Sequence, residues 1–163
     1  MIGIFYGSSS GNTATLAKTI ASKLGVAPEN VFDVGRSSAD MVAGYDTILL
    51  GSSTWGFGEL QDDWYAFVEK LKLENLAGKR VALFGCGDSD SYPDTFCDAV
   101  GILHDELEGS GCEFVGAMAA DGYSVTGSRA FAGGKVLGLI ADDSDPNKTE
   151  GRMTAWIETL KNS

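Results

Sequence analysis

The stretch from residue 7 to residue 13 carries the side chains best suited to bind an anion. It reads Gly7-Ser8-Ser9-Ser10-Gly11-Asn12-Thr13 and leads from an apolar run into a helical pattern. Free N–H groups and the positive dipole end at the start of a helix attract phosphate, and Gly11 lets the backbone curl tightly around it. Residues 7–17 contain no lysine or arginine, so hydrogen bonds alone would hold one phosphate group. The alternative is a plain Ser/Asn helix cap.

Two further stretches place an aromatic side chain among small residues. They read Ser53-Thr54-Trp55-Gly56-Phe57-Gly58 and Cys86-Gly87-Asp88-Ser89-Asp90-Ser91-Tyr92-Pro93. A tryptophan or tyrosine in such a loop offers a flat stacking surface. For each stretch a plainer interpretation exists: Trp55 could be buried against the following helix, and the second stretch could be an acidic turn.

The elements that must position these loops alternate between strands and helices. Apolar runs at Ile2–Tyr6, Val31–Val34, Thr47–Leu50 and Val81–Phe84 have successive rather than alternating apolar residues, which is typical of parallel strands buried on both faces. Four apolar stripes at helical spacing lie between or after them. These stripes are Leu16, Ile20 and Leu24; Trp64, Phe67, Val68 and Leu71; Phe96, Val100, Leu103 and Leu107; and Met153, Trp156, Ile157 and Leu160. The pattern predicts a doubly wound α/β sheet with right-handed crossovers.

The last strand of this sheet is predicted to be interrupted. Phe114–Ala119 and Val136–Ile140 both read as strands, whereas Ala120–Lys135 between them is rich in Gly, Ser and Asp and shows no period. We expect one edge strand broken by a loop of roughly fifteen residues, a length that is uncommon unless the loop has a role.

Composition fits one globular domain over residues 1–163. Hydrophobic residues make up 44% and charged residues 21%, and the formal net charge of −11 argues against nucleic acids and anionic membranes as partners. No apolar run approaches the roughly 18 residues of a membrane span, and Met1–Tyr6 lacks the basic region of a signal peptide. Cys86, Cys97 and Cys112 have unrelated spacings, so we expect free thiols in the cytoplasm.

The three loops together predict a more specific ligand than any one of them. Each follows a strand of a parallel sheet, so all three lie at its carboxyl edge, where ligands of such sheets bind. A site for one phosphate beside two aromatic side chains suits a planar ring that carries a single phosphate.

These three stretches, in this order, make the sequence resemble the flavodoxins over essentially its whole length. The matching segments are FYGSSSGNT, SSTWGFGELQDDW, FGCGDSDSYPDTFCDAVG and DGYSV…VLGLIADD. The interrupted final strand is similar to that of the long-chain type. The resemblance implies a flavodoxin-like five-stranded parallel sheet of order 2-1-3-4-5 and non-covalently bound FMN. It also implies a low-potential one-electron carrier rather than an enzyme.

The resemblance also assigns roles to individual residues. Phosphate contacts fall on Ser8, Ser9, Ser10, Gly11, Asn12 and Thr13. The two faces of the isoalloxazine ring would meet Trp55 and Tyr92. Around the ring edge and ribityl chain the positions are Ser53, Thr54, Gly56, Phe57, Gly58, Cys86, Gly87, Asp88 and the backbone of Ser89. Two departures are serine where many relatives have threonine in the phosphate loop, and Gly56 where long-chain members often have asparagine or another larger residue.

Ten carboxylates are expected to lie near this edge and to oppose a second negative charge on the flavin. They are Glu59, Asp62, Asp63, Asp88, Asp90, Asp94, Asp98, Asp142, Asp143 and Asp145. We further hypothesise that the peptide between Gly56 and Phe57 turns its carbonyl toward flavin N5 when the first electron and a proton are taken up. Glycine makes such a turn sterically easy.

The acidic edge suggests partners with positive surfaces, bound quickly and weakly. The family's partners include NADP⁺ reductases that act on flavodoxin or ferredoxin, donors of the pyruvate oxidoreductase type and nitrogenase. We expect a monomer, with no metal and no catalytic residue. The enzymatic alternative is an FMN-dependent NAD(P)H or quinone oxidoreductase, which would need open space over the flavin. A phospho-receiver domain would need carboxylates after the first strand, where this chain has serines. A purely structural interaction module would be colourless.

Overall fold

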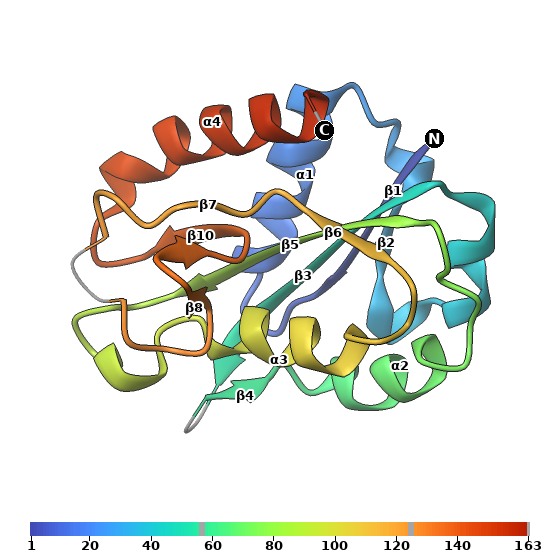
Figure 1. Cartoon of the computed structure of the whole chain (residues 1–163), viewed down its shortest axis with the longest axis horizontal. Helices are drawn as coiled ribbons and strands as arrows, with labels where there is room; N and C mark the ends of the chain where they lie inside the picture. Colours follow the sequence, from blue (N-terminus) through green and yellow to red (C-terminus); the bar gives the residue numbers. More distant parts are fainter. Residues whose placement is uncertain (56–57, 124–125, 163) are drawn as a thin grey trace.

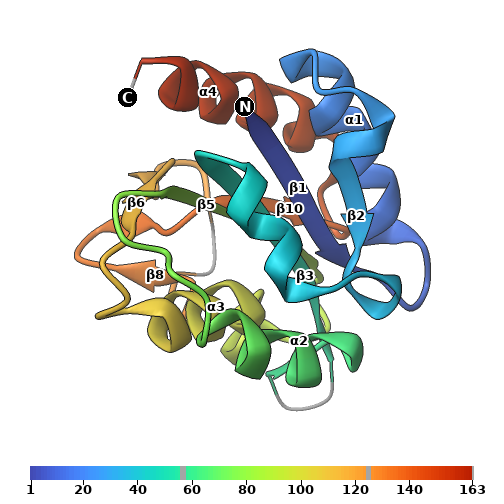
Figure 2. The ribbon, with the colours of Figure 1, turned by 90° about the vertical axis from the view of Figure 1, so that its right-hand side faces the viewer.

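A mainly parallel β-sheet lies between two layers of helices in the computed structural model, which describes residues 1–55, 58–123 and 126–162 (Figures 1 and 2). The helices are α1 (Asn12–Leu24), α2 (Asp63–Leu71), α3 (Asp98–Leu107) and α4 (Thr149–Lys161), with short 3₁₀ turns η1 (Pro28–Asn30), η2 (Val34–Arg36), η3 (Ala39–Gly44), η4 (Pro93–Thr95) and η5 (Pro146–Lys148). No helix in the described part of the chain has the length and apolar character needed to cross a membrane.

The central strands run in the order β2-β1-β3-β5-β10. Their bounds are β1 (Ile2–Gly7), β2 (Val31–Asp33), β3 (Thr47–Trp55), β5 (Arg80–Gly87) and β10 (Leu139–Asp142). All four neighbouring pairs are parallel, so the carboxyl ends of these strands lie at one edge. This confirms the predicted order 2-1-3-4-5, in which β5 is the fourth strand along the sheet and β10 belongs to the fifth.

The fifth strand is interrupted, as predicted, but its halves differ from the predicted bounds. Strand β6 (Glu113–Val115) pairs with Arg80–Ala82 of β5, and β10 pairs with its later residues 84–87. Val136 was predicted to belong to this strand. It lies instead in β9 (Lys135–Val136), part of a separate antiparallel sheet of order β7-β9-β8 with β7 (Met118–Ala119) and β8 (Phe131–Ala132).

The small sheet forms because two glycines close a tight hairpin. Gly133 and Gly134 have φ values of 58° and 78°, and they join β8 to β9 with Ala132 opposite Lys135. Positive φ at both central residues is the requirement of the commonest two-residue hairpin turn. The segment predicted as an irregular loop thus contains an ordered hairpin.

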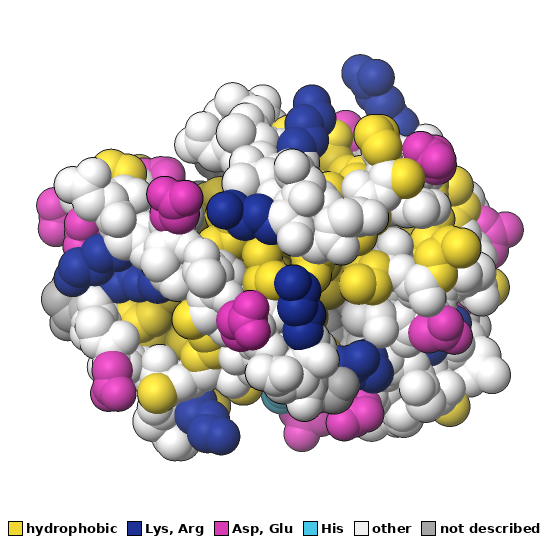
Figure 3. All heavy atoms as spheres, turned by 90° about the horizontal axis from the view of Figure 1, so that it is seen from above, with side chains coloured by type: hydrophobic (Ala, Val, Ile, Leu, Met, Phe, Trp, Pro, Cys, Tyr) yellow, Lys and Arg dark blue, Asp and Glu magenta, His cyan; other side chains and the backbone are white. Residues whose placement is uncertain are grey.

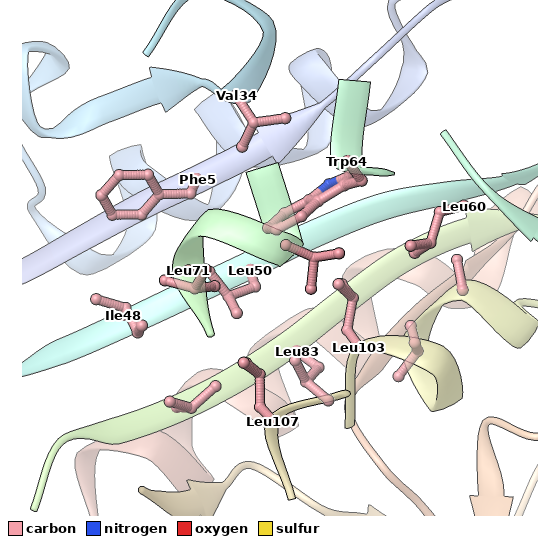
Figure 4. Packing of buried hydrophobic residues seen from close by; sticks show 14 of the residues in the cluster. Phe5, Val34, Ile48, Leu50, Leu60, Trp64, Leu71, Leu83, Leu103 and Leu107 are labelled. Carbon is pink, nitrogen blue, oxygen red and sulfur yellow. The ribbon is translucent and has the colours of Figure 1, made fainter. Parts of the chain in front are cut away.

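The successive apolar residues of each strand fill two separate cores. Phe5 and Leu50 belong to the core under α2 and α3, whereas their neighbours Ile4 and Leu49 belong to the core under α1 and α4. Adjacent strand side chains point to opposite faces, so a doubly covered sheet needs both to be apolar. Figure 4 shows side chains of β1 and β3 facing those of α2 and α3, among them Leu71 and several further leucines.

Candidate functional site

Side chains from the three predicted stretches meet in one cavity at the carboxyl edge of the sheet. The cavity has a volume of about 240 Å³ and is lined by Ser10, Asn12, Ser53, Thr54, Cys86, Gly87, Asp88, Tyr92 and Asp143. Eight of these nine were predicted as ligand contacts, and Asp143 was predicted only as part of the acidic edge. The parallel sheet has therefore brought residues up to 133 positions apart into one concave site, as its topology requires.

Two of the predicted loops begin later than expected. Strand β3 continues through Ser53, Thr54 and Trp55, and β5 continues through Cys86 and Gly87. Residues 54 and 55 also pair antiparallel with β4 (Glu59–Leu60), so this end of β3 extends the sheet beyond its parallel part. Ladder hydrogen bonds hold these residues more firmly than a loop would.

The first stretch presents open donors at the start of α1. Gly11 is the N-cap residue with φ of 93°, and no side chain caps it, contrary to the plain helix-cap alternative. Ser8 Oγ accepts the Gly11 N–H at 3.1 Å, which shapes the turn. Ser10 and Asn12 are exposed, and within the described residues their side chains have no hydrogen-bond partner. The arrangement suits an anion that approaches from outside.

Two predicted phosphate contacts point elsewhere. Thr13 is 1% exposed and donates its hydroxyl to Cys86 Sγ at 3.9 Å, beneath the loop. Ser9 Oγ accepts a hydrogen bond from Gln61 Nε2 at 2.9 Å. In this structure these side chains join the first stretch to β5 and to the segment before α2.

Gln61 is a supporting residue that the sequence reasoning missed. It is 2% exposed, its backbone N–H donates to Ser52 Oγ at 3.1 Å, and its Oε1 accepts the Asp63 N–H at 3.0 Å. A buried glutamine must satisfy its polar atoms inside the protein. No local pattern marks this residue, because two of its partners, Ser52 and Ser9, come from β3 and from the first loop.

Thr54 connects the site to α3. Its hydroxyl accepts the Ala99 N–H at 3.0 Å, while α3 has no side-chain cap from its own N-cap residue, Cys97. Cys97 has φ of 55°, a left-handed conformation that is uncommon for a non-glycine residue. Thr54 therefore satisfies one of the free N–H groups at this helix start.

Replacing Thr54 by valine should lower the free energy of unfolding by about 1 kcal/mol, the usual cost of a lost helix cap. Valine keeps the shape but not the acceptor. Urea unfolding of the ligand-free protein measures the loss, with Thr19→Val as the control, because Thr19 donates only to the Thr15 carbonyl within α1. Equal stability of the Thr54 variant and the parent would contradict the capping role.

The third stretch forms a compact turn that ends at Tyr92. Asp88 Oδ1 accepts the N–H groups of Asp90 and Ser91 at 3.0 and 3.1 Å, and the Asp88 carbonyl accepts the Tyr92 N–H at 3.0 Å. The Tyr92 side chain is 59% exposed, which is unusual for a large aromatic residue. Tyr92 lines the cavity of about 240 Å³ at which the three stretches meet. It also lines a second cavity of about 130 Å³ beside Phe96.

Part of the second stretch lies outside the described residues. This applies to Gly56, to Phe57 and to the side chain of Trp55, so the predicted ring contact and peptide turn stay predictions. Gly58 is described: its φ is 89°, and a Cβ there would lie 2.5 Å from Asp98 Oδ2. Glycine is therefore required at position 58 by both conformation and space.

Cys86, which lines the cavity, has a buried thiol of low reactivity. Burial raises the pKa of Cys86 to about 12, against a smaller lowering by the Thr13 hydrogen bond, and burial also raises the pKa of Cys97 well above its usual value. Thiolate is the reactive form. All three cysteines are free thiols, and Cys112 is the one that is only half-buried.

Iodoacetamide at pH 8 should therefore modify Cys112 well before Cys86 or Cys97 in the native protein. Peptide mass spectrometry after short exposure measures the order, and the urea-unfolded chain, in which all three should react alike, is the control. Preferential modification of Cys86 in the native protein would show that its thiol is neither buried nor protonated.

The carboxylates around the cavity are fewer than predicted but close together. Asp88 and Asp143 line it. Partial desolvation of the Asp143 carboxyl group, followed by the charges of Asp88 and Asp142, raises the pKa of Asp143. Others of the ten point elsewhere: Asp98 accepts the Arg129 N–H at 2.8 Å, and Asp145 lies 3.3 Å from Lys148. The charges of Asp88 and Asp142 contribute to this shift, so they act against a further negative charge at this edge.

A larger cavity continues from the site between α1 and α4. It has a volume of about 580 Å³ and shares Asn12, Cys86 and Asp143 with the site. Figure 3 looks onto this side of the molecule and shows hydrophobic side chains gathered between polar and charged ones. Its floor includes Leu16 and Met153, and none of the aromatic side chains that the structure describes lines it.

Fold and site together define a doubly wound α/β protein with a polar cavity at the carboxyl edge of its sheet. The family model described as flavodoxin matches residues 4–156. A flavodoxin of Synechocystis sp. is 38% identical over 98% of this chain and 95% of its own length, and flavodoxin 1 of Salmonella typhimurium is 41% identical over 97% and 91%. The structure of Fusobacterium nucleatum flavodoxin bound to flavin mononucleotide superposes with a TM-score of 0.88 at 27% identity, covering 99% of this chain and 96% of that one.

This chain therefore belongs to the flavodoxin family, as the resemblance of its three loops indicated. The likeness extends over nearly the full length of the relatives, so the fold, the interrupted edge strand and the three loops all fall within the shared region.

Proposed function

We propose that this protein is a low-potential one-electron carrier that uses non-covalently bound FMN. The observation that carries the proposal is the cavity at which Ser10 and Asn12 meet Thr54 and Tyr92, in a chain of the flavodoxin family. FMN supplies the redox chemistry when it is bound, and the protein binds and tunes it.

The first loop fits the phosphate group. Ser10 and Asn12 offer exposed donors, and a Cβ at Gly11 would meet nothing within 4 Å, so the loop is open on its outer side. The start of α1 adds free N–H groups and its dipole. We assign the phosphate to residues 8–13, with Ser9 and Thr13 acting through the contacts described above.

The second and third stretches fit the ring system. Tyr92 has an exposed ring at the cavity, which suits stacking on one face of a flat ligand. By family resemblance we assign the other face to Trp55, and the ring edge to residues 56–58 and 86–88. Covering both faces excludes water and leaves little room for a substrate.

Asp88 and Asp143 would keep the potential low. Their charges, in a site partly shielded from water, oppose a second negative charge on the bound group. The pKa of Asp143 is raised by partial desolvation and then by the charges of Asp88 and Asp142, so these two charges act in the same direction on that carboxyl group.

Carrier function is favoured over the enzymatic alternative, since the relatives are flavodoxins and not reductases. We propose basic surfaces on redox enzymes as partners, with NADP⁺ reductases, pyruvate oxidoreductase-type donors and nitrogenase as the classes that the family suggests. The free thiols fit a reducing cytoplasm. We also infer one domain over residues 1–163 and a monomer, because the large exposed apolar side chains of the described residues come from separate elements.

Purified protein should be yellow, release FMN on acid precipitation and accept electrons in two separate one-electron steps during a reductive titration. NADPH without a reductase should not bleach it. Colourless protein that fails to take up added FMN would contradict the proposal, and rapid bleaching by NADPH alone would support the oxidoreductase alternative.

A further inference from the structure

Asp142 is a buried carboxylate that the proposed function does not use directly. It is the last residue of β10, stands opposite Gly87 in the parallel ladder and is 6% exposed. Within the described residues, no salt bridge reaches it. A carboxylate in this position needs other groups to stabilise its charge.

Two serines provide that stabilisation. Asp142 Oδ1 accepts the N–H groups of Ser89 and Ser144 at 3.1 and 3.0 Å and the Ser144 hydroxyl at 2.7 Å, while Oδ2 accepts the Ser89 hydroxyl at 2.5 Å. Burial acts to raise the pKa of Asp142, but these hydrogen bonds outweigh it and hold the pKa below its usual value. The group is therefore a carboxylate at neutral pH.

These bonds fasten the loop that follows β5. Within that loop, Asp88 Oδ1 accepts the N–H groups of Asp90 and Ser91, and the Asp88 carbonyl accepts the Tyr92 N–H. Ser89 lies within the same loop, and both its N–H and its hydroxyl donate to Asp142. One further link is the Asp143 N–H, which donates to the Gly87 carbonyl at 2.8 Å.

Neighbouring carboxylates thus have different surroundings. Asp143 is exposed and lines the cavity, so it can act through its charge. Asp142 is buried and does not line that cavity. A group kept only for its negative charge would not need four hydrogen bonds, two of which come from the loop that follows β5.

We propose that Asp142 is a positioning residue that fixes the loop of residues 87–92 and thereby places Asp88 and Tyr92 at the flavin. The inference rests on the proposed function for its ligand, but the fixing of the loop is a property of the ligand-free chain. The same proposal gives Ser89 and Ser144, which donate to Asp142, a role in fixing this loop.

Two substitutions separate geometry from charge. Asp142→Ala removes both the negative charge and the oxygen atoms that accept the hydrogen bonds. Asp142→Asn removes the charge but keeps an oxygen that can accept the Ser89 and Ser144 N–H groups, and the Ser89 hydroxyl can rotate to accept from the new amide. Asp143→Asn is the matched control, because it removes a charge beside the cavity without touching Ser89.

Asp142→Ala should weaken FMN binding to the apoprotein by roughly tenfold to a hundredfold, as expected when hydrogen bonds to a charged group are lost. Asp142→Asn should stay within roughly fivefold of the parent, since neutral hydrogen bonds are weaker but remain. In the ligand-free protein, amide hydrogen exchange at residues 90–92 should speed up in Asp142→Ala and stay unchanged in Asp143→Asn.

Equal losses of FMN affinity in Asp142→Asn and Asp142→Ala would show that charge alone matters and would overturn the inference. So would unchanged exchange at residues 90–92 in Asp142→Ala. Where that variant does not fold, Ser89→Ala serves instead: faster exchange at residues 90–92 supports the inference, and parental exchange contradicts it. Failure of the parent to bind FMN would count against the proposed function, whereas the exchange measurement still decides the role of Asp142.

Discussion

Replacing Ser10 by aspartate should weaken FMN binding about a thousandfold. Ser10 is exposed and lines the cavity. A new carboxylate at about 4 Å from a phosphate charge costs about 4 kcal/mol at the effective dielectric of a protein surface, and each 1.4 kcal/mol is a factor of ten in affinity. Quenching of flavin fluorescence during titration with apoprotein measures the change.

Two controls separate charge repulsion from damage to the loop. Ser10→Asn adds similar bulk without charge and should bind FMN far better than the aspartate variant. Riboflavin lacks the phosphate, so its affinity should be nearly the same in the parent and in Ser10→Asp. If FMN binds equally well to parent and Ser10→Asp, the phosphate does not lie at this loop.

Replacing Gly7 by alanine should lower the free energy of unfolding by about 1–3 kcal/mol, the usual cost of overpacking a core. The added Cβ would collide with Gln61 Oε1 and come within 2.6 Å of Trp64 Cδ1. Trp64 cannot move freely, because it is fully buried and its Nε1 donates to the Gly51 carbonyl at 2.8 Å. Displacing Gln61 would also release Ser9, so FMN affinity should fall together with stability.

Gly151→Ala is the matched control for this prediction. Gly151 lies inside α4, and a Cβ there would meet nothing within 4 Å. Alanine in a helix interior is favoured over glycine by roughly 0.5–1 kcal/mol, so this variant should be more stable than the parent. Urea unfolding of both apoproteins tests the pair, and a Gly7 variant as stable as Gly151→Ala would mean that β1 and α2 pack less tightly than described.

The predictable part of the fold follows from short-range chemistry. Ile4 next to Phe5 and Leu49 next to Leu50 identify strands covered on both faces, since neighbouring strand residues point in opposite directions. Parallel strands must end at one edge, so the meeting of Ser10, Thr54 and Tyr92 follows from the same pattern. The hairpin at Gly133 and Gly134 does not follow from periodicity, because its strands of two residues each are too short to show a period, although the glycine pair is a turn signal.

The sequence by itself determined the parallel sheet and the edge at which the ligand loops gather, because periodicity and turn residues act over a few neighbouring positions. The order of the strands came from the resemblance of the three loops to the flavodoxins. Only the tertiary structure decided that Thr13 turns inward to Cys86, that Gln61 holds Ser9, that Thr54 caps α3 and that Asp142 fastens Ser89. Each of these bonds joins residues between 45 and 73 positions apart, and local pattern does not encode which buried donor faces which acceptor across that distance.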